Sequence, residues 1–87
     1  MIKALQIPEN ITYEFIDANV YILDINNGEY YELSKSASII WREIAGGKDI
    51  YEIKKKLQSL FIENKRIDDD IDEAIKNFIK LGFIEDN

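Results

Sequence analysis

The sequence predicts a small α+β domain in which a three-stranded antiparallel sheet is followed by three helices. Between residues 11 and 33, β-branched and aromatic residues dominate, and beyond Leu33 the hydrophobic period changes to about 3.6. The 87 residues suffice for one hydrophobic core but not for two domains. We therefore expect residues 1–10 to be an N-terminal lead-in and residues 11–87 to form one domain.

Three segments have the composition of strands. ITYEFI (residues 11–16) and VYILDI (residues 20–25) are rich in β-branched and aromatic side chains. Asn27-Gly28 favours a type I′ turn, which requires positive φ at both central residues, so residues 29–33 should return alongside the second strand. An isolated sheet of this size is marginally stable, and its apolar face should therefore pack on the helices.

The first two helices have recognisable starts. Ser34 is placed to cap the first helix, whose inward face should include Trp41, and Gly46-Gly47 should end it. Asp49 followed by Glu52 has the spacing of a capping box for the second helix, which we expect to end near Ile62. Its apolar stripe consists of Ile50, Ile53, Leu57, Leu60 and Phe61.

The third helix should be capped by one of the aspartates at positions 68–70 and end at Gly82. Its inward residues are Ile71, Ala74, Ile75 and Phe78. Phe83 and Ile84 would then form a short tail.

Composition excludes most catalytic chemistry. The chain has no Cys and no His, which removes disulfides, the usual zinc sites, thiolate nucleophiles and His-based catalysis. No run approaches the about 20 apolar residues needed to span a bilayer, so we expect a cytoplasmic protein without a membrane partner. We predict no catalytic residue, metal or cofactor.

The acidic run DDDIDE resembles the start of a calcium-binding loop at Asp68, Asp70 and Asp72. Glu73, however, stands where that loop needs Gly, and Ile79 stands where it needs a bidentate Glu. Acidic residues in the first turn interact favourably with the helix dipole, which is the simpler interpretation.

Three closely connected helices also raise the alternative of a winged-helix transcriptional regulator that binds DNA. The net charge of −6 opposes this hypothesis, and the third helix begins with five acids in six residues. Lys54, Lys55 and Lys56 are consecutive and so do not form one helical stripe. We expect no nucleic-acid partner.

The third strand should be an exposed edge. In a three-stranded meander it pairs with the second strand along one side and leaves its other row of N–H and C=O groups free. GEYYEL contains no proline, inward lysine or other device that would protect such an edge. An extended peptide could therefore add to it as a further strand, and a second copy of the chain is the alternative occupant.

The run VYILDINNGEYYELSKSASIIWREIAGG, residues 20–47, resembles the PqqD family. It contains a hydrophobic strand, a G-x-Y-Y-x-L turn and strand, a polar cap, and then A-x-x-I-W with a glycine helix stop. The similarity continues through DIYEIKKKL to the final LGFIE. The family's pathway proteins typically have a proline-glutamate-glycine turn and a Gly-Trp near the end, where this chain has Asn26-Asn27-Gly28 and Gly82-Phe83. The chain is thus more similar to free-standing leader-binding proteins of lasso-peptide or related clusters.

The resemblance implies a winged-helix-like recognition element for ribosomally synthesised and post-translationally modified peptides (RiPPs). Such an element binds the leader segment of a precursor peptide beside the third strand, in a cleft against the third helix. It is a non-catalytic monomer or weak dimer that presents the leader to a leader peptidase or a radical SAM maturase. The implied backbone edge is Glu29, Tyr30, Tyr31, Glu32 and Leu33. The implied helix wall is Asp69, Asp72, Ile75, Lys76 and Ile79, and which flank of the helix faces the cleft stays open.

Overall fold

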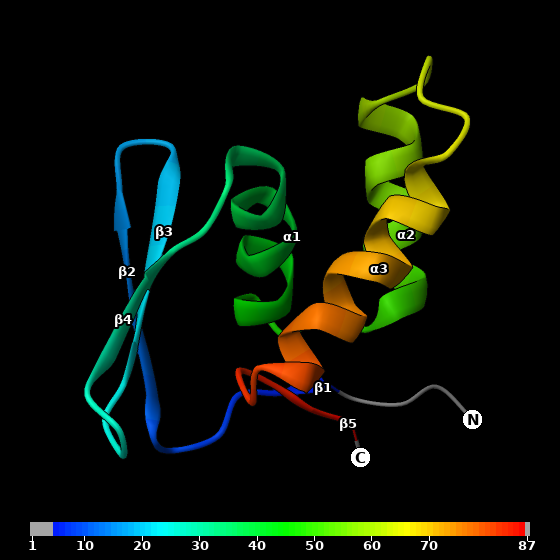
Figure 1. Cartoon of the computed structure of the whole chain (residues 1–87). Helices are drawn as coiled ribbons and strands as arrows, with labels where there is room; N and C mark the ends of the chain where they lie inside the picture. Colours follow the sequence, from blue (N-terminus) through cyan, green and yellow to red (C-terminus); the bar gives the residue numbers. More distant parts are fainter. Residues whose placement is uncertain (1–4, 87) are drawn as a thin grey trace.

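A computed structural model describes residues 5–86 and confirms the α+β fold. The antiparallel sheet has the order β2-β3-β4, with β2 at Ile11–Ile16, β3 at Asn19–Asp24 and β4 at Glu29–Glu32. These strands match the predicted ones to within one residue at each end. Figure 1 shows the sheet on one side of helix α1, with helices α2 and α3 on the other.

The β3–β4 hairpin closes by a longer loop than the predicted type I′ turn. Among the loop residues only Gly28 has a positive φ, at 73°, so the prediction that Asn27 shares this conformation is wrong. The loop spans residues 25–28, and the Gly28 N–H donates to the Asp24 carbonyl at 2.8 Å. Asn27 instead accepts the Glu29 N–H through its side-chain oxygen at 2.8 Å. With four loop residues, one left-handed glycine is enough to reverse the chain.

Helices α1 (Lys35–Ala45) and α2 (Ile50–Leu60) begin as predicted. The Ser34 hydroxyl accepts the Ala37 N–H at 3.2 Å. Asp49 and Glu52 form a capping box, in which each side chain accepts the backbone N–H of the other residue. Helix α2 stops at Leu60, before the expected end near Ile62, and the last two apolar residues of its predicted stripe, Leu60 and Phe61, are exposed.

Helix α3 (Ile67–Lys80) begins earlier than predicted. Arg66 precedes it without a side-chain cap, so the prediction that one of the aspartates at 68–70 is the cap is wrong. The Asn64 side-chain oxygen accepts the Arg66 N–H at 3.0 Å and turns the chain into the helix from outside. The three aspartates consequently occupy the first helical turn, next to the positive end of the helix dipole.

The C-terminus of α3 folds the tail into the core. Gly82, with φ 80°, lets the Phe83 N–H bond the Phe78 carbonyl at 2.9 Å and the Gly82 N–H bond the Ile79 carbonyl at 3.0 Å. These two bonds make a Schellman motif, and the Phe78 and Phe83 rings lie 6.4 Å apart. Phe83 and Ile84 are therefore buried residues rather than a free tail, at 1% and 2% exposure.

Within the core, Trp41 of α1 joins the sheet to α3 and to the segment that follows it. Its buried ring meets Tyr13 of β2, Phe78 of α3 and Phe83 edge-on, with centroids 5.3–6.3 Å apart. Ser38, also fully buried, accepts the Val20 N–H at 2.9 Å and ties α1 to β3. The prediction that Trp41 is a core residue is confirmed.

Two short strands were not predicted. β1 (Leu5–Gln6) pairs antiparallel with β5 (Glu85–Asp86), so part of the segment interpreted as a lead-in lies beside the end of the chain. This pairing secures the segment after α3 beneath the helices (Figure 1). Strands of two residues show no periodicity that a sequence could reveal.

Candidate functional site

Within the described part of the chain, strand β4 pairs with β3 only, and the register defines which of its backbone groups are free. The Leu33 N–H donates to the Val20 carbonyl at 2.9 Å, and Ile22 is paired with Tyr31. Because hydrogen-bonded pairs alternate along antiparallel strands, Tyr31 and Leu33 direct their backbone groups at β3. Tyr30 and Glu32 therefore direct an N–H and a C=O each away from the sheet.

The two tyrosines of β4 face opposite sides, as strand alternation predicts. Tyr31 is half-buried, and its ring lies 4.9 Å from that of Phe83. Tyr30 is 56% exposed on the outer face, where its ring meets that of Tyr21 at 5.8 Å. Hence β4 is anchored to the core through Tyr31, while Tyr30 is free to contact a partner.

Carboxylates next to these tyrosines alter their acidity. The Tyr31 hydroxyl donates to the Glu29 carboxylate, and this hydrogen bond, with desolvation and the charge of Glu29, raises the pKa of Tyr31. Desolvation and the charge of Glu32 raise the pKa of Tyr21. Both phenols stay neutral and able to donate hydrogen bonds at physiological pH.

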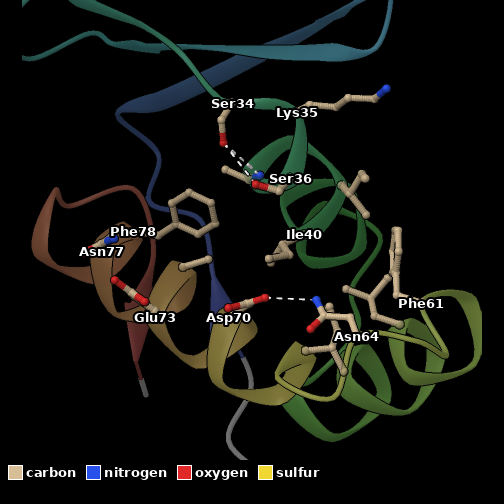
Figure 2. A pocket seen from close by; sticks show the side chains of 15 residues that line it. Ser34, Lys35, Ser36, Ile40, Phe61, Asn64, Asp70, Glu73, Asn77 and Phe78 are labelled. Atoms are coloured by element: carbon tan, nitrogen blue, oxygen red, sulfur yellow. Dashed lines mark hydrogen bonds between the residues drawn. The ribbon is translucent and has the colours of Figure 1, made fainter.

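A groove of about 890 Å³ opens directly after β4, between the start of α1, the end of α2 and one flank of α3. Figure 2 shows Ser34, Lys35 and Ser36 on the α1 side and Asp70, Glu73 and Asn77 on the α3 side. Its floor is made of apolar side chains, including Ile40, Leu57, Ala74 and Phe78. The chain reaches the groove only two residues after β4 ends, since Ser34 lines it.

One end of the groove is closed by the loop between α2 and α3. Phe61, which was predicted to extend the buried stripe of α2, is 39% exposed and lines the groove instead. The Asn64 side-chain amide donates to the Asp70 carboxylate at 3.1 Å across this end (Figure 2). This bond holds the loop against α3.

The helix-wall residues predicted from the sequence do not line this groove. Ile75 is 4% exposed and belongs to the core. Asp72 forms a salt bridge with Lys54 of α2 at 2.8 Å, and Asp69 lies 4.0 Å from Arg66. Successive residues of a helix are rotated by about 100° about its axis, so Lys76 and Ile79 share a flank with Asp69 and Asp72. That flank faces away from the groove.

Sequence reasoning missed the groove-facing flank of α3 and the loop that closes the groove. The inward positions of α3 were predicted, and Phe78 among them contributes to the floor. A helix has two flanks beside its buried stripe, however, and the stripe alone does not say which one faces α1. The sequence signal for the groove-facing flank was Asn77. This polar residue lies next to Phe78, on the flank of α3 that does not carry the predicted wall residues.

Comparison with known proteins identifies the family. The model of the family described as Coenzyme PQQ synthesis protein D (PqqD) matches residues 19–84, which is most of the chain. The chain belongs to the PqqD family. This confirms the resemblance, and the match begins at the first residue of β3. No curated protein matches the chain significantly.

Two solved structures share the fold of this PqqD-family chain. One is described as TbiB1 in complex with the TbiA(beta) leader peptide, with a TM-score of 0.78, 21% identity, and coverage of 92% of this chain and 94% of that chain. The other is a lasso peptide synthetase B1 complexed with the leader peptide, with a TM-score of 0.80, 22% identity, and coverage of 93% and 96%. Both neighbours are thus complexes with leader peptides.

Two further observations concern other kinds of site. Across residues 5–86, none of the helices is both long and apolar enough to cross a bilayer. Within the same described residues, no three acidic side chains gather in a way that would hold a metal ion. The acidic start of α3 instead makes bonds within the protein, since Asp68 accepts a hydrogen bond from Gln58 at 2.8 Å.

Proposed function

We propose that the chain binds the leader segment of a ribosomally synthesised precursor peptide, which adds to β4 as a further strand. The observation that carries the proposal is the free edge of β4, where Tyr30 and Glu32 offer unpaired backbone groups beside an apolar groove. Strand addition uses such groups for affinity and neighbouring pockets for side-chain selectivity. Membership of the PqqD family and the leader-peptide complexes of two fold neighbours support this function.

Along the edge, the binding residues in this proposal are those expected from the sequence, Glu29 to Leu33. Tyr30 and Glu32 provide the backbone bonds, whereas Tyr31 and Leu33 hold the strand on the core. For the opposite wall we favour the flank of α3 that carries Asp70, Glu73 and Asn77, because this flank lines the groove next to β4. The alternative wall, with Asp69 and Asp72, faces α2.

We further propose that the chain presents the bound leader to a separate enzyme of the same pathway, a leader peptidase or a radical SAM maturase. Without His, the chain lacks the side chain that most often serves as a general base, and without Cys it lacks a thiolate nucleophile. The groove offers apolar side chains and carboxylates that suit binding. The chemistry would belong to the partner.

The test is a titration of ¹⁵N-labelled protein with the leader segment of a precursor encoded beside the gene. Strand addition should shift the amides of Tyr30 and Glu32 more than those of Tyr31 and Leu33, whose backbone groups already bond β3. Amides on the groove side of α3 should also shift. An unchanged spectrum at high leader excess would disprove the proposal.

Two controls separate the competing functions. Duplex DNA at low ionic strength should leave the same amides unchanged, and salt-sensitive binding of the duplex would favour the winged-helix regulator instead. Sedimentation of the free protein should give a monomer or a weak dimer. A tight dimer that leader peptide does not dissociate would mean that β4 pairs with a second copy.

A further inference from the structure

The floor of the groove is suited to an apolar side chain of a ligand. Ile40, Leu57 and Phe78 line it and are only 5%, 1% and 3% exposed, so they form a fixed surface rather than mobile side chains. A volume of about 890 Å³ lies within the range of small-ligand sites, about 300–1,000 Å³. It therefore has room for a few side chains of an extended peptide and not for a folded domain.

The α3 wall above this floor carries the carboxylates of Glu73 and Asp70, and neither forms an ion pair within residues 5–86. Glu73 is exposed, has no hydrogen bond or ion pair within the described part of the chain, and lies in the second turn of α3, beyond the reach of the helix dipole. Asp70 receives one hydrogen bond, from Asn64, and its carboxylate borders the same wall. The two carboxylates thus stand over the apolar floor without a cation.

The cations among residues 5–86 do not neutralise this wall. Lys35 is the one basic residue among those that line the groove, and Figure 2 shows its side chain directed away from Asp70 and Glu73. On α3 itself, Lys76 follows Glu73 by three residues, yet no ion pair joins the two side chains. The free edge of β4 adds Glu29 and Glu32, and the whole chain has a net charge of −6. A peptide lying along this surface passes carboxylates on both sides.

We infer that the leader segment in the groove combines a hydrophobic side chain, which enters the floor, with a Lys or Arg beside it that pairs with Glu73 and Asp70. In an extended peptide, successive side chains point to opposite faces, so a basic residue two positions from the anchor lies on the anchor's face and reaches the wall. An acidic neighbour would meet like charges and be rejected. This inference rests on the proposed function, since it describes the peptide bound at the same site.

The experiment selects short random peptides from a displayed library on immobilised protein, so no natural leader is needed. Selection runs in parallel on the wild type and on the double variant Asp70→Asn/Glu73→Gln. The matched control is Glu9→Gln/Glu14→Gln, which removes the same charge at exposed positions outside the groove and β4. A fourth protein, Asp69→Asn/Asp72→Asn, removes it from the other flank of α3. Selected peptides are then titrated into ¹⁵N-labelled wild type to find which amides they shift.

We expect peptides selected on the wild type and on the control to shift Tyr30 and Glu32 and to contain Lys or Arg two positions from a large apolar residue. The groove double variant should lose this basic preference and bind the same peptides roughly three- to tenfold more weakly, as for two solvent-exposed ion pairs. Added salt should narrow that difference.

Three other results overturn the inference in distinguishable ways. Peptides that shift Tyr30 and Glu32 but lack a basic preference refute the inference and leave the proposed function intact. If Asp69→Asn/Asp72→Asn removes the preference and the groove variant does not, the basic residue pairs with the other flank. If no selected peptide shifts the β4 amides, both the inference and the proposed function fail.

Discussion

Replacing Tyr30 by proline should weaken leader binding while leaving the fold intact. The register directs the Tyr30 N–H away from β3, so its loss breaks no bond of the β3–β4 ladder. Proline is tolerated in edge strands when the missing N–H faced solvent. It also restricts the preceding residue to extended conformations, which Glu29 already adopts in β4.

The expected loss of affinity follows from one backbone hydrogen bond. Such a bond contributes about 0.5–1.5 kcal/mol net, which corresponds to roughly a two- to twelvefold increase in Kd. The proline ring lies where the incoming strand would approach, so this range is a lower bound. Fluorescence anisotropy with a labelled peptide that binds the wild type measures the change, and circular dichroism with a thermal melt verifies the fold.

Two companion variants isolate the cause. Tyr30→Ala keeps the N–H and removes only the ring, so it separates the backbone from the side chain. Tyr31→Pro removes an N–H that bonds β3 and should destabilise the whole domain, which shows that the assay detects ladder damage. A folded Tyr30→Pro protein that binds as tightly as the wild type would refute strand addition at this edge.

The remaining predictions concern stability and acidity. Ser38→Ala should cost about 1–3 kcal/mol in chemical denaturation, because the buried Val20 N–H loses its acceptor, whereas Ser59→Ala on the exposed face of α2 should change stability by less than about 0.5 kcal/mol. Gly28→Ala should lower the free energy of unfolding by about 1–2 kcal/mol, because Gly28 has a φ of 73° and no atom lies within 4 Å of an added Cβ to clash with it. Gly28→Asn should lower it by less. Equal melting temperatures for the two variants would contradict this reasoning. Since Glu29 raises the pKa of Tyr31, the folded state should be stabilised by the neutral phenol below the ordinary tyrosine pKa of about 10 and lose this contribution as the pH rises further. Ultraviolet titration of Glu29→Gln should show tyrosinate forming at lower pH than in the wild type, and an unchanged titration would exclude Glu29 as the cause.

Features set by neighbouring residues were predictable from the sequence. The Ser34 cap and the Asp49–Glu52 capping box each join residues three positions apart, so the spacing alone specifies the bond. Trp41 was predictable as core because its position repeats with the helical period. The start of α3 was not, since three adjacent aspartates compete equally for the cap and the deciding bond comes from the Asn64 side chain in the loop before them.

Features that join distant segments escaped the sequence. The β1–β5 pairing brings residues 5–6 beside residues 85–86, and neither strand is long enough to show alternation. The burial of Phe83 depends on the Schellman bonds at Gly82, for which the glycine was a visible signal. In the sequence, that glycine indicates only where the helix stops, whereas the motif also directs the following residue back onto the helix.

The choice of flank on α3 shows most clearly what hydrophobic periodicity cannot determine. The buried positions Ile71, Ile75 and Phe78 fix the rotation of the helix about its axis, and this rotation was predicted correctly. It leaves one flank on each side of the buried stripe, and only the position of α1 decides which one borders β4. Because β4 runs directly into α1 through Ser34, the flank that faces the start of α1 must also face the end of the free edge. In the proposed complex, a leader strand along β4 would therefore reach Asn77, Glu73 and Asp70 before Asp72, whose carboxylate pairs with Lys54 of α2.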